Sequence, residues 1–213
     1  MFGTWAGGDA HEEPHATARP IIQDMSARIR EHATYQDLLK VPDNMVAELI
    51  EGELFASPRP AGAHTNASSA LGALVMPPFQ FGRGGPGGWW IFDEPELHIQ
   101  SNVLVPDLAG WRRERMPEYP KNHVFAIVPD WICEITSPGS GWLDRLKKMP
   151  VYARAGIVHA WLIDPEQQVL EVYRGEGDGW HLIATDGETE VVRVPPFEEL
   201  ALELALLWGP PPS

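Results

Sequence analysis

The segment Trp131-Ile132-Cys133-Glu134-Ile135-Thr136-Ser137 carries one acidic residue among strongly apolar ones. It is typical of a β-strand, in which alternate side chains lie on opposite faces. Glu134 therefore shares a face with Ile132 and Thr136, and the other face is apolar. A buried carboxylate needs a cation, a metal ion or hydrogen-bond donors. The alternative is an edge strand on which Glu134 points into water.

Short strand-like segments surround this one on both sides, separated by turn residues. Those before it are Glu48–Phe55 as a strand, turn and strand, and then Trp89–Phe92, Glu96–Ile99 and Val103–Trp111. Those after it are Ala160–Ile163, Val169–Tyr173 and Trp180–Ile183, of which the last two predict a C-terminal β-meander.

Helical patterns are fewer than strand patterns. The sequence predicts a short helix from Tyr35 after a capping Thr34, a helix over His64–Val75, and a partly helical Leu146–Ala155. A loop is expected over Pro77–Gly88 because that stretch is rich in proline and glycine. The fold class is therefore α/β (α+β), a mixed central β-sheet flanked by a few helices.

Length and composition predict one globular domain. The chain has 213 residues, of which 44% are hydrophobic, so it can bury a substantial core. We expect a flexible N-terminal tail over residues 1–30, a single domain over residues 31–208, and a C-terminal tail over residues 209–213, where three prolines follow a glycine.

The cellular setting follows from what the chain lacks. No apolar run approaches a membrane span, and the N-terminus lacks the pattern of a signal peptide. The single cysteine, Cys133, excludes an internal disulfide and fits a reducing compartment as a buried small hydrophobe. We therefore expect a cytoplasmic protein without a membrane partner.

The charge balance argues against a nucleic-acid partner. Only 16 Lys and Arg residues accompany 30 Asp and Glu residues, which gives a formal net charge of −14. Phosphate backbones are bound mainly through Lys and Arg. A nucleic-acid ligand would therefore require a localised basic patch.

Two lysines follow the acidic strand closely. Asp144 and Lys148 are four residues apart and would pair on a helix face. Pro150 leaves two arrangements open for this segment. If it lies in the first helical turn, Lys147 and Lys148 are on a preceding loop, and if it lies inside the helix, the helix is kinked.

Several segments together, in order and with matching spacing, resemble the Uma-type family of predicted restriction endonucleases. The resemblance runs from about Thr34 to about Tyr173. The matching segments are Glu48-Leu49-Ile50-Glu51-Gly52-Glu53-Leu54, Ser57-Pro58 with His64 downstream, Val105-Pro106-Asp107, Glu134-Ile135-Thr136-Ser137-Pro138, Asp144 with Lys148, Tyr152-Ala153 with Gly156, and Trp161-Leu162-Ile163-Asp164-Pro165. This family is grouped with the PD-(D/E)XK nucleases, so the resemblance implies a restriction-endonuclease-like fold.

The resemblance also implies roles for individual residues. Asp107 resembles the first metal-binding aspartate, Glu134 the second carboxylate, and Glu48 an additional acid from the N-terminal part of the fold. Thr136 stands where the usual motif has its lysine. The family pattern implies that this lysine has moved to Lys148, with Lys147 as a substitute.

These residue types suit metal-dependent hydrolysis. Mg²⁺ is held by one or two carboxylates together with water and substrate phosphate, and Asp107, Glu134 and Glu48 supply such carboxylates. Mn²⁺ is the alternative ion. A lysine beside the metal would orient a water or offset charge in the transition state. His64 fits either a surface position at a helix start or a catalytic one.

The leading hypothesis is a magnesium-dependent endonuclease that acts on nucleic acid, with DNA as the expected substrate. The candidates for its basic patch are Arg59, Arg83, Arg112, Arg113, Arg115, Lys121, Arg145, Lys147 and Lys148. The second hypothesis is a non-catalytic binding module on the same fold, as a homodimer joined through an exposed strand or an aromatic patch. A third is hydrolysis of a small phosphoester, which an acidic surface would hinder less.

Overall fold

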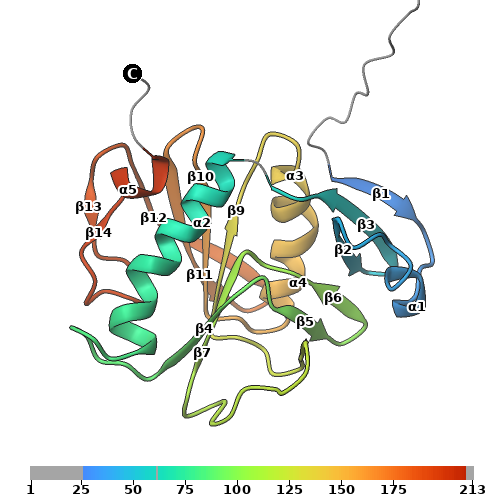
Figure 1. The fold of residues 1–213 in the computed structure, drawn as a ribbon, viewed down its shortest axis with the longest axis horizontal. Helices are drawn as coiled ribbons and strands as arrows, with labels where there is room; N and C mark the ends of the chain where they lie inside the picture. Colours follow the sequence, from blue (N-terminus) through green and yellow to red (C-terminus); the bar gives the residue numbers. More distant parts are fainter. Residues whose placement is uncertain (1–25, 61, 210–213) are drawn as a thin grey trace, which may run out of the picture.

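Two β-sheets of six strands each form the framework of the protein (Figure 1). The computed structural model describes residues 26–60 and 62–209. The first sheet contains, in spatial order, β1 (Ala27–Arg30), β3 (Glu53–Pro58), β2 (Met45–Ile50), β6 (Asn102–Leu104), β5 (Glu96–Ile99) and β8 (Val124–Phe125). Its hairpin β2–β3 turns at Glu51 and Gly52, which both have positive φ angles.

The second sheet carries the acidic strand. Its spatial order is β12 (Gly179–Gly187), β11 (Val169–Glu176), β10 (His159–Asp164), β9 (Trp131–Ile135), β7 (Leu108–Arg112) and β4 (Trp89–Asp93). The pair β9–β10 is parallel and the other pairs are antiparallel, so the sheet is mixed as predicted. Strands β11 and β12 form the predicted C-terminal meander. A separate small pair consists of β13 (Val191–Val192) and β14 (Leu202–Glu203).

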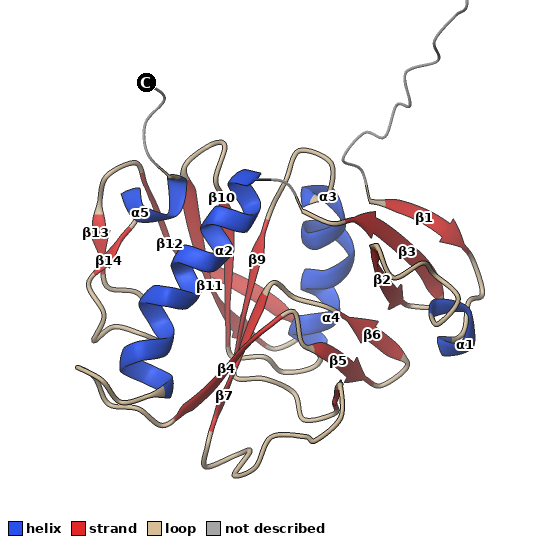
Figure 2. Ribbon diagram, in the orientation of Figure 1, coloured by secondary structure: helices blue, strands red, loops and turns tan. Residues whose placement is uncertain are grey.

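Helices cover both faces of the second sheet (Figure 2). On one face lie α2 (Gly62–Val75) with its π-helical continuation η1 (Met76–Gln80), and α5 (Ala205–Trp208). On the other face lies a helix built from α3 (Gly141–Leu143), the π-helical turn η2 (Asp144–Lys148) and α4 (Met149–Arg154). The short α1 (Tyr35–Leu38) packs beside β2 in the first sheet. None of the helices in residues 26–60 and 62–209 is long and apolar enough to cross a membrane.

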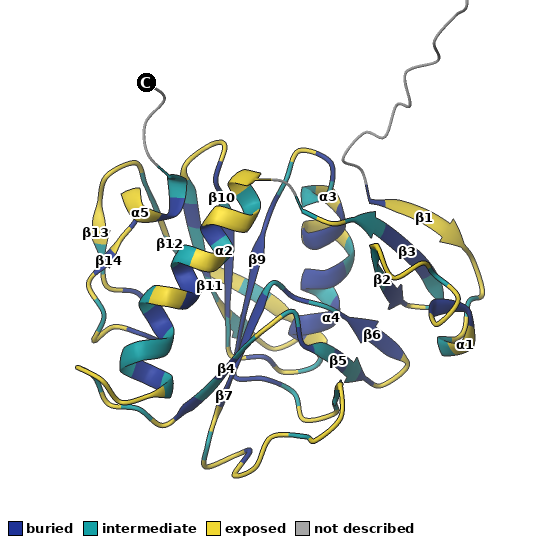
Figure 3. Cartoon of the chain, in the orientation of Figure 1, coloured by how far each residue is buried: buried dark blue, intermediate teal, exposed yellow. Residues whose placement is uncertain are grey.

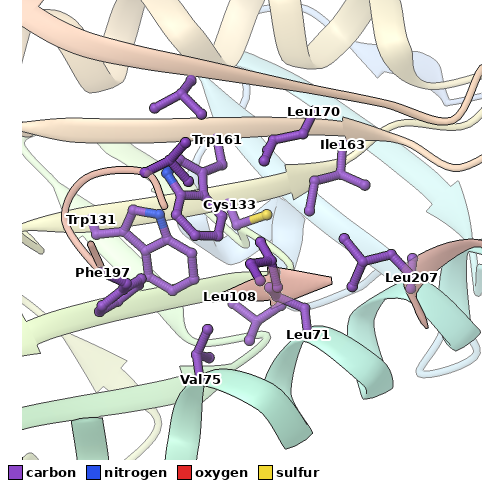
Figure 4. Packing of buried hydrophobic residues seen from close by; sticks show 14 of the residues in the cluster. Leu71, Val75, Leu108, Trp131, Cys133, Trp161, Ile163, Leu170, Phe197 and Leu207 are labelled. Atoms are coloured by element: carbon purple, nitrogen blue, oxygen red, sulfur yellow. The ribbon is translucent and has the colours of Figure 1, made fainter. Parts of the chain in front are cut away.

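Strand β9 has the two faces that its sequence predicts. Trp131, Cys133 and Ile135 join one hydrophobic cluster with α2 and α5, and Figure 4 shows Trp131 and Cys133 beside Trp161. Ile132 belongs to the opposite cluster, under α3 and α4. Figure 3 shows β9 as buried along its length. Any polar group on this strand is therefore removed from water.

The structure corrects three predicted boundaries. Ala27–Arg30 form β1, paired with β3, so these four residues are not part of a tail. The rest of the predicted N-terminal tail, residues 1–25, and residues 210–213 lie outside the described residues. The predicted strand Val103–Trp111 is wrong, because its ends belong to different sheets and Pro106, which has no backbone N–H, lies between them. The loop predicted from Pro77 begins four residues later than expected, because η1 continues to Gln80.

Pro150 lies inside the helix rather than at its start. The backbone N–H of Met149 donates to the carbonyl of Asp144, five residues back, which is the hydrogen bond of a π-helical turn. Because proline lacks an N–H, a widened turn before it accommodates its ring without ending the helix. Lys147 and Lys148 consequently project from a helix and not from a loop.

Candidate functional site

Four predicted residues from four separate segments line one cleft. Glu48 comes from β2, Asp107 precedes β7, Glu134 lies on β9, and Lys148 ends η2. The cleft has a volume of about 70 Å³, which is room for several water molecules. His64 near the start of α2 also lines it. The fold therefore brings together residues that are as much as 100 positions apart, from 48 to 148.

The ammonium group of Lys148 is the centre of this cluster. Its Nζ atom lies 3.0 Å from Glu48 Oε1 and 2.9 Å from the carboxylate of Glu134. It also donates to the backbone carbonyl of Val105 at 3.1 Å, and Asp144 Oδ1 is 3.6 Å away. Only 4% of the lysine side chain is exposed. A charge this deeply buried is tolerated because acidic groups surround it.

Glu134 is held by donors from two turns of one helix. Lys148 approaches its carboxylate, and the hydroxyl of Tyr152 donates to Oε1 at 2.7 Å. Burial raises the pKa of Glu134 well above its ordinary value, and the positive charge of Lys148 opposes that effect. The edge-strand alternative is wrong, because β9 lies between β7 and β10 and Glu134 is buried.

Asp107 is anchored by the neighbouring strand. Its Oδ2 atom accepts the backbone N–H of Ile135 at 2.6 Å, which the pairing of Leu108 with Cys133 makes possible. Its Oδ1 atom lies 3.1 Å from Nε2 of His64. Burial lowers the pKa of His64, but the hydrogen bond and charge of Asp107 outweigh burial and raise it overall. The Nδ1 atom of His64 is buried without a hydrogen-bond partner among the described residues.

The remaining carboxylates make the cluster rich in negative charge. Glu48 Oε1 accepts the backbone N–H of Val105 at 2.8 Å in addition to its contact with Lys148. Burial raises the pKa of Asp144 to about 7, Lys148 opposes this, and Asp107 and Glu48 add to it. Three acids, Glu48, Glu134 and Asp144, thus share one ammonium group, and the charge of Asp107 acts on Asp144 as well. Such a cluster favours a further cation or protons.

The residues of the cleft could bind a hard divalent ion only if water molecules or the substrate supplied further ligands. Across residues 26–60 and 62–209, no three His, Cys, Asp or Glu side chains are grouped closely enough to hold a metal by themselves. Mg²⁺ commonly keeps several waters and uses one or two carboxylates. Asp107 and Glu134 provide hard oxygen donors on a cleft with space for water. A site of that type is compatible with these residues.

The two lysines that the sequence left open occupy different surroundings. Lys147 pairs with Glu53 at 2.6 Å, away from the residues that line the cleft, whereas Lys148 lines it. Thr136, in the usual lysine position, is buried and donates to the carbonyl of Ile163 at 3.3 Å. Of these residues, Lys148 is therefore the one that places a charge in the cleft.

Two cluster members were not assigned roles from the sequence. The pairing of Asp144 with Lys148 was expected as an ordinary helical ion pair, but it is part of the buried cluster. Tyr152 lies four residues after Lys148 and follows the same helix face, which is the signal that could have identified it. Its burial raises the pKa of the phenol, as does the neighbouring Glu134.

The predicted basic patch does not form around the cleft. Of its nine candidates, Lys148 is the one found among the described lining residues. Several of the others are neutralised by acids: Arg59 by Glu94, Arg115 by Asp130, Arg145 by Glu171 and Lys147 by Glu53. Acids outnumber bases in this chain, so an acidic partner is available for each of these basic side chains.

Comparisons with known proteins agree with this architecture. A structure described as “a putative nuclease belonging to DUF820” from Anabaena variabilis is similar, with a TM-score of 0.63 and 28% sequence identity. The similarity covers 83% of this chain and 97% of the other. No curated protein matches. The model of the Uma2 family, described as “Putative restriction endonuclease”, matches residues 33–206. Because that match extends over most of the sequence, this chain belongs to the Uma2 family.

Proposed function

We propose that this protein is a metal-dependent nuclease that hydrolyses a phosphodiester bond in nucleic acid, with DNA as the expected substrate. The observation that carries the proposal is the meeting of Asp107, Glu134, Glu48 and Lys148 on one cleft. The membership in a family described as restriction endonucleases supports the reaction class. An acidic cluster with a single buried ammonium group suits an ion and a phosphate better than an apolar ligand.

Each residue has a separate task in this proposal. Asp107 and Glu134 would hold Mg²⁺ or Mn²⁺, with Glu48 as an auxiliary ligand. The ion, when bound, would polarise the phosphoryl oxygen and lower the pKa of a water molecule. Lys148 would orient the attacking water and offset charge that develops on the phosphate. Loss of Lys148 should therefore reduce the rate more than it reduces metal affinity.

The test of this function separates metal binding from cleavage. Mg²⁺ and Mn²⁺ are titrated calorimetrically into the wild type, Asp107→Ala and the control Asp178→Ala, which changes an exposed aspartate in the β11–β12 turn. Cleavage is then measured on single- and double-stranded DNA and RNA at low salt. We expect binding and cleavage in the wild type and the control, and neither in Asp107→Ala. Absence of both activities from the wild type would disprove the proposal.

A non-catalytic binding module is the competing function. It is favoured because, in the described part of the chain, no three His, Cys, Asp or Glu side chains lie close enough together to bind a metal ion. In that case Lys148 would serve only to neutralise buried acids. The expected homodimer and cytoplasmic location stay predictions under both functions. Sedimentation of the wild type tests the dimer, and the titration above decides between the functions.

Hydrolysis of a small phosphoester is supported by the scarcity of basic side chains at the cleft. The cleft has a volume of about 70 Å³ and Lys148 is the sole basic candidate lining it in the described ranges. A small ester needs no long basic groove. Turnover of bis(p-nitrophenyl) phosphate without cleavage of any polynucleotide would favour this function over the first.

A further inference from the structure

A second cavity adjoins the catalytic cleft. Its volume is about 520 Å³, within the range of pockets that bind small molecules. Val46, Glu94 and Val105 line both spaces, so the two are adjacent. The lining of the second cavity includes residues of α1 and β2 and of β4 and β5. A polymeric substrate that occupies the cleft would therefore pass close to this second cavity.

Both aromatic and aliphatic side chains line the cavity. Phe92 from β4 and Phe125 from β8 line it, with ring centroids 5.2 Å apart. Phe125 also stacks on the buried Trp111 at 5.0 Å with an interplanar angle of 27°. Leu39 and Val41 are among the aliphatic lining residues. Because the rings are held by packing, a flat ligand can contact them at little cost in ordering.

The polar groups of the cavity are mainly hydrogen-bond acceptors. Glu96 is oriented by Tyr35, whose hydroxyl donates to Oε1 at 3.0 Å, and by His98, whose Nε2 lies 2.6 Å from the same oxygen. Within the described ranges neither contact uses Oε2, which therefore keeps its lone pairs for a ligand. Carboxylates accept hydrogen bonds from the exocyclic amino groups of nucleobases.

The charges of the cavity disfavour a phosphate backbone. Its acidic lining residues are Asp43, Asp93, Glu94 and Glu96, and its basic ones are Arg59 and His123. Arg59 is already paired with Glu94 at 2.9 Å. An uncharged base avoids the repulsion that a phosphate would meet here. Bases become available for such a pocket only when they are unpaired or unstacked.

We propose that this cavity is a nucleobase pocket, and that the substrate is single-stranded or locally opened nucleic acid carrying a base with an exocyclic amino group, such as adenine or cytosine, beside the cleft. The inference rests on the proposed nuclease function and adds a substrate class to it. The base would lie against Phe92 and Phe125 and donate its amino group to Glu96. Recognition through a base explains how an acidic chain, whose described cleft residues include a single lysine and no arginine, could hold a nucleic acid.

The test measures binding without cleavage, using fluorescein-labelled oligo(dC), oligo(dA) and oligo(dT) and a mixed-sequence duplex in EDTA. We expect the full chain to bind oligo(dC) and oligo(dA) about tenfold more tightly than the duplex. Oligo(dT), which lacks an exocyclic amine, should bind more weakly than either. The affinity should fall only weakly with salt, in contrast to binding through phosphates.

Glu96→Gln distinguishes base recognition from contact with the backbone by the sign of its effect. Loss of a negative charge strengthens any binding that depends on phosphates. Because Tyr35 and His98 hold Oε1, the NH₂ group of glutamine would replace the acceptor Oε2 with a donor and weaken base binding by about tenfold. The matched control is Glu203→Gln on β14, on the opposite side of the molecule in Figure 1. Stronger binding by Glu96→Gln, or no measurable binding of any oligonucleotide by the wild type, would overturn the pocket.

A second variant, which blocks the cavity, covers the case in which Glu96→Gln binds less only because it is less stable. Leu39 is 56% exposed, so Leu39→Trp can narrow the cavity without disturbing the core, and Leu206→Trp at 49% exposure is its control. We expect about tenfold weaker oligonucleotide binding by Leu39→Trp alone, at an unchanged melting temperature. If oligolysine binds instead and Leu39→Trp blocks it, the cavity accepts a cationic peptide and the base pocket is wrong.

The two proposals can fail separately. If single strands bind as expected but Mg²⁺ and Mn²⁺ produce no cleavage, the nuclease function fails and the pocket stands. If strands are cleaved while neither Glu96→Gln nor Leu39→Trp changes their binding, the nuclease function stands and the pocket is wrong.

Discussion

The Nζ atom of Lys148 lies 2.9 Å from the carboxylate of Glu134, although one residue ends a π-helical turn and the other lies within a buried strand. The helix that carries Lys148 packs on the face of the sheet that Glu134 shares with Ile132. The lysine thus reaches the carboxylate from outside the strand. This contact places a positive charge in the cleft even though Thr136 occupies the usual lysine position.

Replacement of Lys148 by alanine should destabilise the protein by about 3–5 kcal/mol, because it leaves buried carboxylates without a counter-charge. Lys147→Ala is the matched control. Its partly exposed pair with Glu53 should contribute within about 1 kcal/mol. Urea unfolding of both variants measures the difference. Equal losses of stability would show that the buried cluster does not depend on Lys148. Cleavage assays on Lys147→Ala would show separately which lysine is needed for activity.

The stability of the metal-free protein should fall as the pH rises from about 4 to about 7. Burial raises the pKa of Asp144 to about 7 from 3.8, so in this window the folded state keeps a proton that the unfolded state releases. A tenfold change in proton affinity corresponds to about 1.4 kcal/mol, and the expected loss is on the order of a few kcal/mol. Urea midpoints measured across this range provide the test.

Asp144→Asn should flatten that pH dependence and should be more stable than the wild type at pH values above about 7, since the amide carries no charge to desolvate. Asp178→Asn, at an exposed position, should leave the profile unchanged. An Asp144→Asn profile that is as steep as the wild-type profile would mean that another buried acid, such as Glu134, is responsible.

The hydroxyl of Tyr152 donates a 2.7 Å hydrogen bond to Glu134, and we expect it to position that carboxylate. Tyr152→Phe should lower stability by about 1–3 kcal/mol, because a buried acceptor loses a donor. If Glu134 is a metal ligand, the variant should also weaken metal binding and lower kcat more than it changes KM. Tyr119→Phe, with a half-exposed ring, is the control. A loss of stability with unchanged metal affinity would reduce Tyr152 to a structural role.

Phe197 should be among the most sensitive positions of the core. Its ring contacts those of Trp131 at 4.9 Å, Trp161 at 5.7 Å and Phe79 at 4.5 Å, and it is 1% exposed. Phe197→Ala should cost about 3–5 kcal/mol in the free energy of unfolding. Phe81→Ala, at 57% exposure, should change it by less than about 0.5 kcal/mol. Similar unfolding midpoints for both variants would contradict this packing.

The local elements were predictable where one residue pattern decides one structure. The alternation in β9, the hairpin turn at Glu51-Gly52 and the capping of α1 by Thr34 all depend on neighbours in the chain. Thr34 is the N-cap residue as predicted, and its backbone N–H and its hydroxyl both donate to the carboxylate of Asp37. Boundaries were less predictable. The strand pattern at Ala27–Arg30 is weak because all four residues are exposed, and only pairing with β3 makes it a strand.

The sequence by itself determined the family resemblance, the mixed sheet and the residue types from which a hydrolytic centre could be built. Tertiary structure alone decided that Lys148 rather than Lys147 enters the cleft and that Asp144 and Tyr152 join the buried cluster around it. It also decided that, within residues 26–60 and 62–209, Lys148 is the one predicted basic side chain that lines the cleft. The reason is physical. The alternation of side chains in a strand and the capping of a helix depend on residues that are close together in the sequence. Burial, ion pairing and the pKa of a carboxylate depend on side chains that meet only when distant segments pack together.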